Sequence, residues 1–409
     1  MIDASRRFSV APMMDWTDRH CRVFHRLLTK YTLLFTEMVT SAAIVHGDRG
    51  RLLGYSPVEH PLAAQLGGSD PKELGVATRI CTEFGYDEIN LNVGCPSDRV
   101  QSGRFGACLM AEPALVADCV RSMRDATDVP VTVKCRLGID DQDTEQSLDR
   151  FVDLMVEAGA AHIYVHARKA WLKGLSPKEN RTVPPLDYPR VYRLAQRLAP
   201  YAISINGGIA DLDQAEAHLQ HVSGVMLGRA AYHEPMLLAD VDARFFDDAE
   251  RRPDLPAIMH AMADYAETAL VSGARLSNVT RHMLGLANGR PGARLFRQVL
   301  SVDAARRGAG PEILLRALAA VRGGRQRAAR LRRMAFCARH WTAGRTVARA
   351  RGRPPAGAHC RCRIRPAHRE HGLHEARRRS RGRLRRRAEG IRAHRRSRFA
   401  GEGTRQGHR

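Results

Sequence analysis

A single cysteine stands at the end of a strand-like run, held between a glycine and a proline. The run Glu88–Val93 leads directly into Gly94, Cys95 and Pro96. Catalytic residues of barrel enzymes lie at the C-terminal ends of strands, and a thiol placed there acts as a nucleophile or as a proton donor. A buried structural cysteine is the alternative that this segment alone leaves open. Cys108 is the next candidate for the same role.

Two later strand-like runs end in residues that suit a phosphate group. Asn206, Gly207 and Gly208 end the first of these runs, and Gly228 and Arg229 follow the second. Glycine backbone N–H groups can close around an anion where side chains would block them, and an arginine adds positive charge. A pair of glycines alone is more often a simple turn, so this pattern gains weight only together with other residues.

Two further polar side chains lie in the strand-like runs before these glycines. Lys134 lies within one run and His166 near the end of the next. A lysine inside a parallel sheet is unusual unless it is paired or functional, whereas a histidine there is more often a satisfied core residue. Together with the glycines, the two side chains favour a phosphate-bearing flavin whose reduced, anionic form they stabilise at the N1/O2 edge.

These residues are spaced along a repeating pattern of strand-like runs and helices. Eight strands are predicted, at Phe8–Met13, Leu33–Met38, Leu62–Gly67, Glu88–Val93, Val129–Leu137, His162–Ala167, Ala202–Asn206 and Gly224–Leu227. Apolar runs that alternate with helices predict a parallel sheet covered by helices, and eight such units match a (β/α)₈ TIM barrel. A doubly wound sheet is the alternative, but the first turn lacks the G-x-G-x-x-G pattern.

Helical periodicity predicts the remaining elements and the domain boundaries. Barrel helices are expected at 71–84, 112–127, 144–158, 188–198 and 212–219, and later helices at 258–273, 278–286, 293–305 and 311–321. The pattern changes near residue 250 from alternating elements to helices alone. We therefore expect a catalytic barrel at 1–250, a small helical domain at 251–321 and a tail at 322–409.

Positive charge is concentrated in the tail. The whole chain has a net charge of +23, but residues 322–409 hold 29 arginines and four acidic residues, which leaves residues 1–321 with a net charge of −2. The basic composition is therefore no evidence that the barrel binds nucleic acid. The tail is expected to be disordered. It is either an RNA-binding arm or, in the interpretation we favour, an extension produced by a shifted reading frame.

Cysteine spacing and hydropathy give the expected compartment. The cysteines of residues 1–321 show no C-x-x-C pair, and no apolar run reaches the ~18 residues that a membrane span requires. The start of the chain does not have the pattern of a signal peptide. We expect a cytoplasmic monomer that contacts no membrane and holds no metal.

Taken together, these motifs resemble the tRNA-dihydrouridine synthases, and in particular their A subfamily. The run Leu91–Pro96 is similar to the family signature, and residues 11–18 and 170–186 resemble segments of the A subfamily. The resemblance implies an FMN cofactor. The residues that it assigns to FMN are Pro12, Met13, Gln65, Lys134, His166, Asn206, Gly207, Gly208, Gly228 and Arg229.

The resemblance also implies a reaction and a substrate. The expected reaction is reduction of uridine to 5,6-dihydrouridine at tRNA positions 20 and 20a, with NADPH or NADH reducing the flavin. The expected tRNA contacts are Asn92, Lys178, Arg181, Arg294 and Arg297. Flavin N5 would give a hydride to C6 and the cysteine a proton to C5, with the base flipped out of its stack. Two departures from the family pattern are a less aromatic linker at 286–290 and the tail.

Two other functions remain open from the sequence. The first is a flavin barrel that oxidises or reduces a free pyrimidine. The second is an RNA-binding protein whose barrel is only a scaffold. The appended helices with Arg294 and Arg297 count against the first, because a small substrate needs no second domain. The full set of cofactor residues counts against the second.

Overall fold

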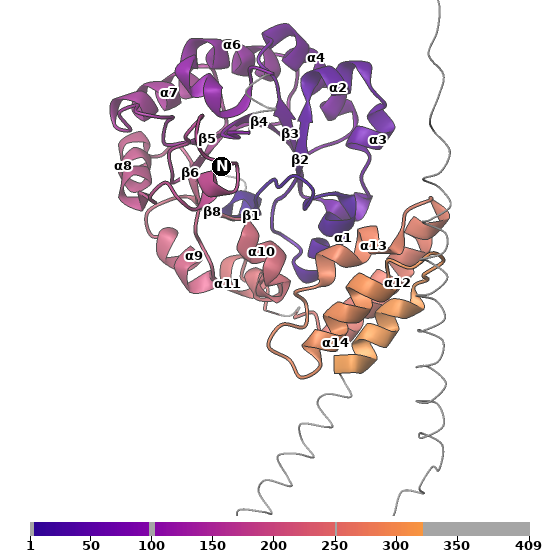
Figure 1. The fold of residues 1–409 in the computed structure, drawn as a ribbon. Helices are drawn as coiled ribbons and strands as arrows, with labels where there is room; N and C mark the ends of the chain where they lie inside the picture. Colours follow the sequence, from indigo (N-terminus) through magenta and orange to yellow (C-terminus); the bar gives the residue numbers. More distant parts are fainter. Residues whose placement is uncertain (1–3, 98–102, 250–251, 322–409) are drawn as a thin grey trace, which may run out of the picture. The chain divides into compact units, whose positions relative to one another are not determined.

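Eight parallel strands close into a barrel in the computed structural model, which describes residues 4–97, 103–249 and 252–321. The strand order is β1-β8-β7-β6-β5-β4-β3-β2. The remaining seam, between β1 and β2, is joined by a parallel bridge between Ser9 and Leu33, where the N–H of Val10 donates to the Leu33 carbonyl at 3.0 Å. The predicted TIM barrel is thus confirmed, and the doubly wound sheet is excluded (Figure 1).

All eight predicted strands are present. Their bounds are β1 (Phe8–Val10), β2 (Leu34–Thr40), β3 (Leu62–Gly67), β4 (Glu88–Val93), β5 (Val131–Arg136), β6 (His162–His166), β7 (Ile203–Asn206) and β8 (Gly224–Leu227). Every residue of β3, β7 and β8 is buried. This burial explains the nearly continuous apolar runs, because a parallel strand in a barrel is covered on both faces.

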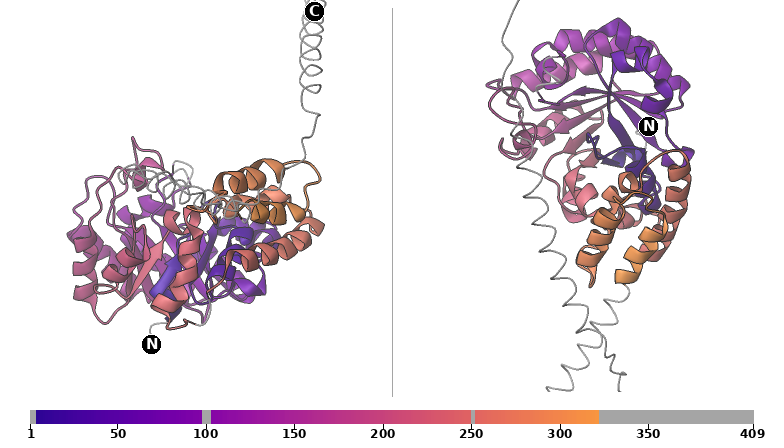
Figure 2. Two further views of the ribbon diagram at one scale, coloured as in Figure 1. Left: turned by 90° about the horizontal axis from the view of Figure 1, so that it is seen from below. Right: turned by 45° about the vertical axis from the view of Figure 1, so that its right-hand side comes forward.

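A ring of helices surrounds the barrel (Figures 1 and 2). They are α1 (Arg19–Leu28), α2 (Ser41–His46), α3 (Arg49–Leu53), α4 (Pro71–Glu83), α6 (Pro113–Arg124), α7 (Gln146–Glu157), α8 (Tyr188–Leu198), α9 (Leu212–His218), α10 (Arg229–His233) and α11 (Val241–Phe245). The start of α4 shows the local cause. The Asp70 side chain accepts the Glu73 N–H at 2.8 Å, and Pro71 occupies the first turn.

Helices α4, α6, α7, α8 and α9 agree with the predicted ones, whereas α1 and the short helices α2, α3, α10 and α11 were not predicted. Arg22, His25 and Arg26 are all buried in α1, at positions where an apolar residue is expected. Arg26 explains why burial is tolerated, since its guanidinium donates to backbone carbonyls that include those of Thr29 and Thr32. Buried polar residues of this kind hide the apolar periodicity on which helix prediction depends.

The C-terminal helices differ in detail from the prediction. They are α12 (Leu255–Val271), α13 (Leu276–Thr280), α14 (Ala293–Gln298) and a helix at 312–321. The helix expected at 278–286 is only a short α13 followed by a 3₁₀ turn, and that expected at 293–305 changes to a π-helical turn at Val299–Asp303. The barrel and these helices belong to one compact unit, in which α12 and α13 contact α1.

The tail predicted at 322–409 lies outside the described residues. Within the part of the chain that the structure describes, no helix is long and apolar enough to cross a membrane.

Candidate active site

A large cavity of about 2160 Å³ opens at the C-terminal ends of the strands. Thirteen of the sixteen predicted site residues line it. They are Pro12, Met13, Gln65, Asn92, Cys95, Lys134, His166, Arg181, Asn206, Gly207, Gly208, Gly228 and Arg229. The other three, Lys178, Arg294 and Arg297, are exposed and do not line it. The strand ends therefore bring together the predicted cofactor residues but not all of the predicted tRNA contacts.

Cys95 is held by its backbone on both sides, while its thiol lies in the wall of the cavity. The Asn92 side-chain oxygen accepts the N–H groups of Gly94 and Cys95 at 3.1 and 3.0 Å. On the other side, the Cys95 carbonyl accepts the Ala107 N–H at 2.9 Å. The half-buried thiol lies 3.6 Å from the Ser97 hydroxyl. The geometry fixes the main chain at this position and leaves the sulfur accessible to a ligand.

Cys108, the second candidate thiol, is placed differently. Its sulfur lies 3.2 Å from the Phe105 carbonyl, and the residue does not line the cavity. Burial raises the pKa of this thiol. Its position favours a packing role.

Four basic side chains lie along the cavity beside β5 to β8, and we call them the cationic wall: Lys134, Arg136, Arg181 and Arg229. Their hydrogen-bond acceptors are neutral. Lys134 Nζ donates to the Asn206 side-chain oxygen at 3.1 Å, and the three arginines donate to backbone carbonyls. Among the residues with described positions, no carboxylate lies within the 4.0 Å ion-pair distance of any of the four.

The two cations on β5 show the electrostatic cost of this arrangement. Burial, and then the charge of Arg136, lower the pKa of Lys134 to about 8. Burial likewise lowers the pKa of Arg136 to about 10. Arg136 lies beside the thiol loop, since its Nε donates to the carbonyl of Gly94, the residue before Cys95, at 2.9 Å. Buried positive charges without carboxylate partners are stabilised when an anion binds beside them.

His166 carries an unfilled hydrogen-bonding position. Burial, followed by the charges of Arg136 and Lys134, holds the pKa of this imidazole well below its usual range. Its Nδ1 atom is buried and has no hydrogen-bond partner within the described structure. Buried polar atoms in proteins almost always have a partner, so a ligand that fills the cavity is expected to supply one.

The turn after β7 brings its backbone to the cavity. Gly207 and Gly208 have φ angles of 116° and 75°, which side-chain-bearing residues rarely adopt. A Cβ atom on Gly208 would lie 2.6 Å from a methyl carbon of Leu186, and the Tyr188 hydroxyl donates to the Gly207 carbonyl at 2.7 Å. Both positions therefore require glycine. The cationic wall, the unpartnered imidazole and this exposed backbone together fit a flavin nucleotide.

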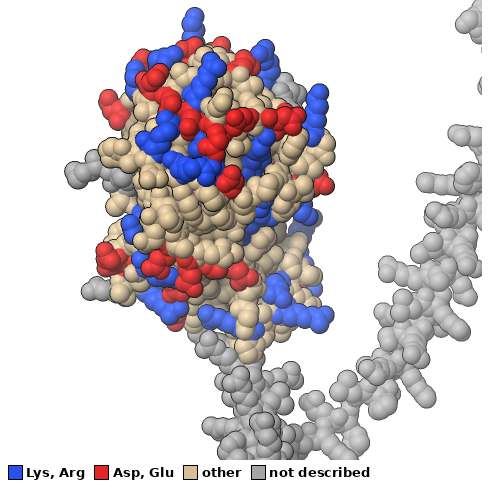
Figure 3. Space-filling model, turned by 90° about the vertical axis from the view of Figure 1, so that its left-hand side faces the viewer, with Lys and Arg blue, Asp and Glu red and all other residues tan. Residues whose placement is uncertain are grey.

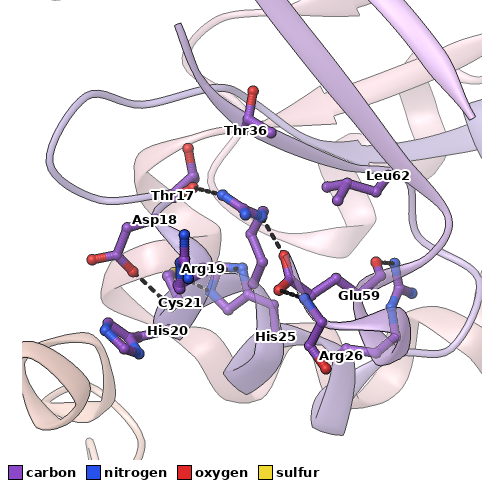
Figure 4. Close-up of polar contacts among 12 residues, drawn as sticks. Thr17, Asp18, Arg19, His20, Cys21, His25, Arg26, Thr36, Glu59 and Leu62 are labelled. Atoms are coloured by element: carbon purple, nitrogen blue, oxygen red, sulfur yellow. Dashed lines mark hydrogen bonds and ion pairs between the residues drawn. The ribbon is translucent and has the colours of Figure 1, made fainter. Parts of the chain in front are cut away.

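The opposite side of the cavity also carries charges, but these are paired. We call Asp18, Arg22 and Glu59 the paired wall. Arg22 Nε lies 2.6 Å from a Glu59 oxygen, and a second guanidinium nitrogen donates to the Thr17 carbonyl at 2.7 Å. Figure 4 shows Thr17, Asp18 and Glu59 around the first turns of α1. The pair fixes the loop between β1 and α1, which lines the cavity.

Asp18 connects this loop to the C-terminal helices. It caps α1 by accepting the Cys21 N–H at 2.9 Å, and it lies 2.5 Å from Arg281 and 3.0 Å from His282. Burial opposes its charge, but the contacts from His282, Cys21 and Arg281 hold the pKa of Asp18 well below its usual range. The carboxylate thus orients both the loop and the helices that follow the barrel.

Besides the paired wall, Arg136 and Glu37 line the cavity and were not predicted from the sequence. Arg136 ends β5, two positions after Lys134, and its Nε donates to the Gly94 carbonyl at 2.9 Å. A basic residue at a strand end was the signal that could have identified it. Glu37 accepts the Asp15 N–H at 2.5 Å, and burial raises the pKa of its carboxyl group. No spacing in the sequence points to that contact.

Known proteins with similar sequences share one family description. A family model described as dihydrouridine synthase (Dus) matches residues 9–321. A tRNA-dihydrouridine(20/20a) synthase from Xanthomonas axonopodis pv. citri is 60% identical over 77% of this chain and 94% of its own length. The proteins of that name from Vibrio parahaemolyticus and Escherichia coli K12 are 57% and 56% identical over 78% and 77% of this chain, and over 97% and 91% of their own lengths.

Among solved structures, an old yellow enzyme homologue from Zymomonas mobilis is similar with a TM-score of 0.44 and 13% identity. The match covers 62% of this chain and 92% of that one, a likeness too distant to carry weight.

Proposed function

The chain belongs to the dihydrouridine synthase family, and on this premise we propose that it reduces uridine to 5,6-dihydrouridine at positions 20 and 20a of tRNA. FMN is the proposed cofactor and NADPH, or NADH, the proposed reductant. The relatives named for that reaction are 56% to 60% identical to this chain, which spans 91% to 97% of their length. Identity of this extent over nearly the whole of each relative supports the same substrate.

One observation carries the cofactor assignment. The cationic wall and the unpartnered Nδ1 of His166 lie in the same cavity as the Cys95 thiol. Lys134 and Arg229 would hold the negative charge of FMN, and the imidazole would bond to a polar atom of the ring. The bound FMN would supply the hydride for the uracil ring. This assignment explains why Lys134 and Arg136 of β5, whose charges are opposed by burial, face the cavity without carboxylate partners.

The role of Cys95 follows from its position. Reduction of the uracil C5–C6 bond requires a proton at one carbon as well as a hydride at the other. Cys95 would donate that proton to C5 as a general acid, because its sulfur lies in the cavity wall while Asn92 and Ala107 hold its main chain. The cavity volume of about 2160 Å³ leaves room for a flipped nucleotide above a flavin.

RNA binding must come from local positive charge. Figure 3 shows basic and acidic side chains interspersed on one face of the molecule, in keeping with the net charge of −2 over residues 1–321. We propose that Arg181 contacts the nucleotide that enters the cavity, and that the exposed Lys178, Arg294 and Arg297 contact the tRNA outside it. Such contacts to phosphates position an RNA without reading its sequence.

The function is tested with purified protein and unmodified tRNA. Flavin absorption near ~370 and ~450 nm is expected, as for protein-bound flavins in general. With NADPH present, mass spectrometry of tRNA fragments should show a gain of two hydrogens at positions 20 and 20a. A flavin-loaded protein that reduces free uracil or orotate but leaves tRNA unchanged would favour the free-pyrimidine function. A protein that binds no flavin would favour the scaffold function.

A further inference from the structure

A line of buried hydrogen bonds leads away from the Cys95 loop into the barrel. The amide nitrogen of Asn92 donates to the Gln65 side-chain oxygen at 2.8 Å. The Gln65 nitrogen donates to the Asn90 side-chain oxygen, and the Asn90 nitrogen donates to the Thr132 hydroxyl, both at 2.8 Å. Each side chain in this line thus donates a hydrogen bond to the next one. The line crosses from β4 to β3, returns to β4 and ends on β5.

The line ends at a buried carboxylate. The Thr132 hydroxyl donates to one Glu88 oxygen at 2.5 Å. The other Glu88 oxygen accepts Arg6 Nε at 2.6 Å and the Tyr164 hydroxyl at 3.3 Å. Asn90 and Thr132 are fully buried, and Glu88 is 1% exposed. No water is needed to complete the line. Asn90, Thr132 and Glu88 are enclosed by the barrel, whereas Gln65 and Asn92 line the cavity.

The two ends of the line determine its direction. At the Cys95 end, backbone N–H groups can only donate, so the Asn92 oxygen must face them. At the far end, a carboxylate paired with Arg6 accepts, so the Thr132 hydroxyl must donate to it. Each amide between these ends has one orientation that satisfies both neighbours. If one amide turned over, two donors would meet and a buried bond would be lost.

We propose that Asn90, Thr132 and Glu88 are positioning residues for Cys95. They act through Gln65 and Asn92, whose fixed amide orientations hold the Gly94 and Cys95 N–H groups and therefore the direction of the thiol. The inference deepens the proposed function and rests on it where dihydrouridine formation is concerned. Groups of this kind affect a reaction by geometry, since a displacement of about 1 Å at a reacting group can cost ~10²-fold in rate.

The test removes the hydroxyl in the middle of the line. Thr132→Val keeps the size and branching of the side chain but leaves the Asn90 nitrogen and one of the two Glu88 oxygens without the hydrogen bond to Thr132. Thr78→Val is the matched control, because Thr78 is equally buried and its hydroxyl has no hydrogen-bond partner in the described structure. Thr132→Ser restores a hydroxyl, and Thr132→Ala repeats the deletion with a smaller side chain if the valine variant does not fold.

The first readout needs no catalysis. Iodoacetamide modifies accessible thiols, and peptide mass spectrometry follows the Cys95 and Cys108 peptides of the flavin-loaded protein separately. Thr132→Val should change the rate of Cys95 modification by about threefold or more, while the rate of Cys108 modification stays constant. The reason is that the line of hydrogen bonds reaches the Cys95 loop and not Cys108. Thr78→Val should change neither rate.

The second readout is single-turnover formation of dihydrouridine. Thr132→Val should lower this rate by about tenfold or more, with unchanged KM for tRNA and unchanged reduction of the flavin by NADPH, and Thr132→Ser should recover most of it. Equal behaviour of Thr132→Val and Thr78→Val in both readouts would overturn the proposal, as would a serine variant as impaired as the valine variant. If wild-type protein makes no dihydrouridine, the proposed function fails, and the alkylation rates still decide the positioning role.

Discussion

The charged side chains on the two sides of the cavity differ in their partners. On the paired wall, Arg22 meets Glu59 at 2.6 Å and Asp18 meets Arg281 at 2.5 Å, so each charge is satisfied within the chain. On the cationic wall, Lys134 and Arg229 donate only to neutral oxygens. The difference separates charges that hold the scaffold in place from charges that are available to a ligand.

The physical reason is the cost of burying a charge. An ion pair removed from water recovers part of that cost through mutual attraction, and it becomes destabilising when one partner is lost. A cation without a carboxylate partner does not recover this cost, so its neutral form is favoured. Burial and the charge of Arg136 therefore lower the pKa of Lys134 to about 8. Substitutions on the paired wall should therefore change stability, and those on the cationic wall should change ligand binding.

The largest expected effect is on the paired wall. Arg22→Met should lower the free energy of unfolding by about 3–5 kcal/mol, because it leaves the fully buried Glu59 carboxylate without its partner. Urea denaturation followed by circular dichroism measures the change. In the double variant Arg22→Met/Glu59→Gln much of the loss should be regained. A double variant as unstable as Arg22→Met alone would show that the pair is not what stabilises this wall.

The next effect concerns Cys95, which lies in the loop after β4. Cys95→Ala should lower dihydrouridine formation by about 10²-fold or more, the span usual for a lost general acid, while FMN binding and reduction by NADPH persist. The loss of activity would then come neither from lower stability nor from weaker cofactor binding. Cys108→Ala is the matched control and should retain activity, because its sulfur lies outside the cavity lining. Full activity of Cys95→Ala would move the acid role to another group.

A smaller effect is expected from Lys134 and depends on pH. Since its pKa in the ligand-free protein is about 8 rather than 10.5, Lys134 is protonated at pH 7 and mostly neutral at pH 9. The dissociation constant for FMN should therefore rise by up to about tenfold between these pH values, as linkage to one proton requires. Fluorescence titration of the apoprotein measures it.

Lys134→Met provides the control for that titration. The variant should bind FMN more weakly at pH 7, and its affinity should no longer fall with pH through this group. It should not be less stable than wild type at pH 7. A lowered folded-state pKa means that the unfolded chain holds the proton more tightly between about pH 8 and 10.5, so wild-type stability rises over that range. If Lys134→Met lowers the stability at pH 7, then Lys134 stabilises the fold, as the residues of the paired wall do, and is not held available for a ligand.

The two walls also differ in how far the sequence predicts them. Two members of the cationic wall follow from local pattern, since Lys134 and Arg229 stand in or after an apolar run and parallel strands end at one edge of a barrel. The paired wall does not, because its contacts join residues that are 37 and 263 positions apart. Nothing in the spacing of Asp18 and Arg281 indicates that they meet.

The fold shows the same limit. All eight strands are predicted because a covered parallel strand reads as an apolar run, whereas α1 is hidden by its buried Arg22, His25 and Arg26. The short α13 and the π-helical turn after α14 could not be predicted from apolar periodicity, which continues through both breaks. Where packing replaces an apolar residue with a hydrogen-bonded polar one, the sequence pattern no longer reports the structure.

The smallest effect on turnover is expected from the segment at 322–409, which contains 29 arginines and four acidic residues. A chain that ends at Val321 should modify tRNA at a rate within about twofold of the full chain, because the cavity residues all precede that point. Its affinity for tRNA should depend less steeply on salt, since each lost phosphate contact changes the slope of log affinity against log salt concentration by about 0.7–0.9.

Filter binding from low to high salt measures this slope, and the yield of dihydrouridine measures the turnover. If the shortened protein folds and holds flavin but leaves tRNA unmodified, then RNA is held by those arginines, and the local contacts at Arg181 and Arg294 are insufficient.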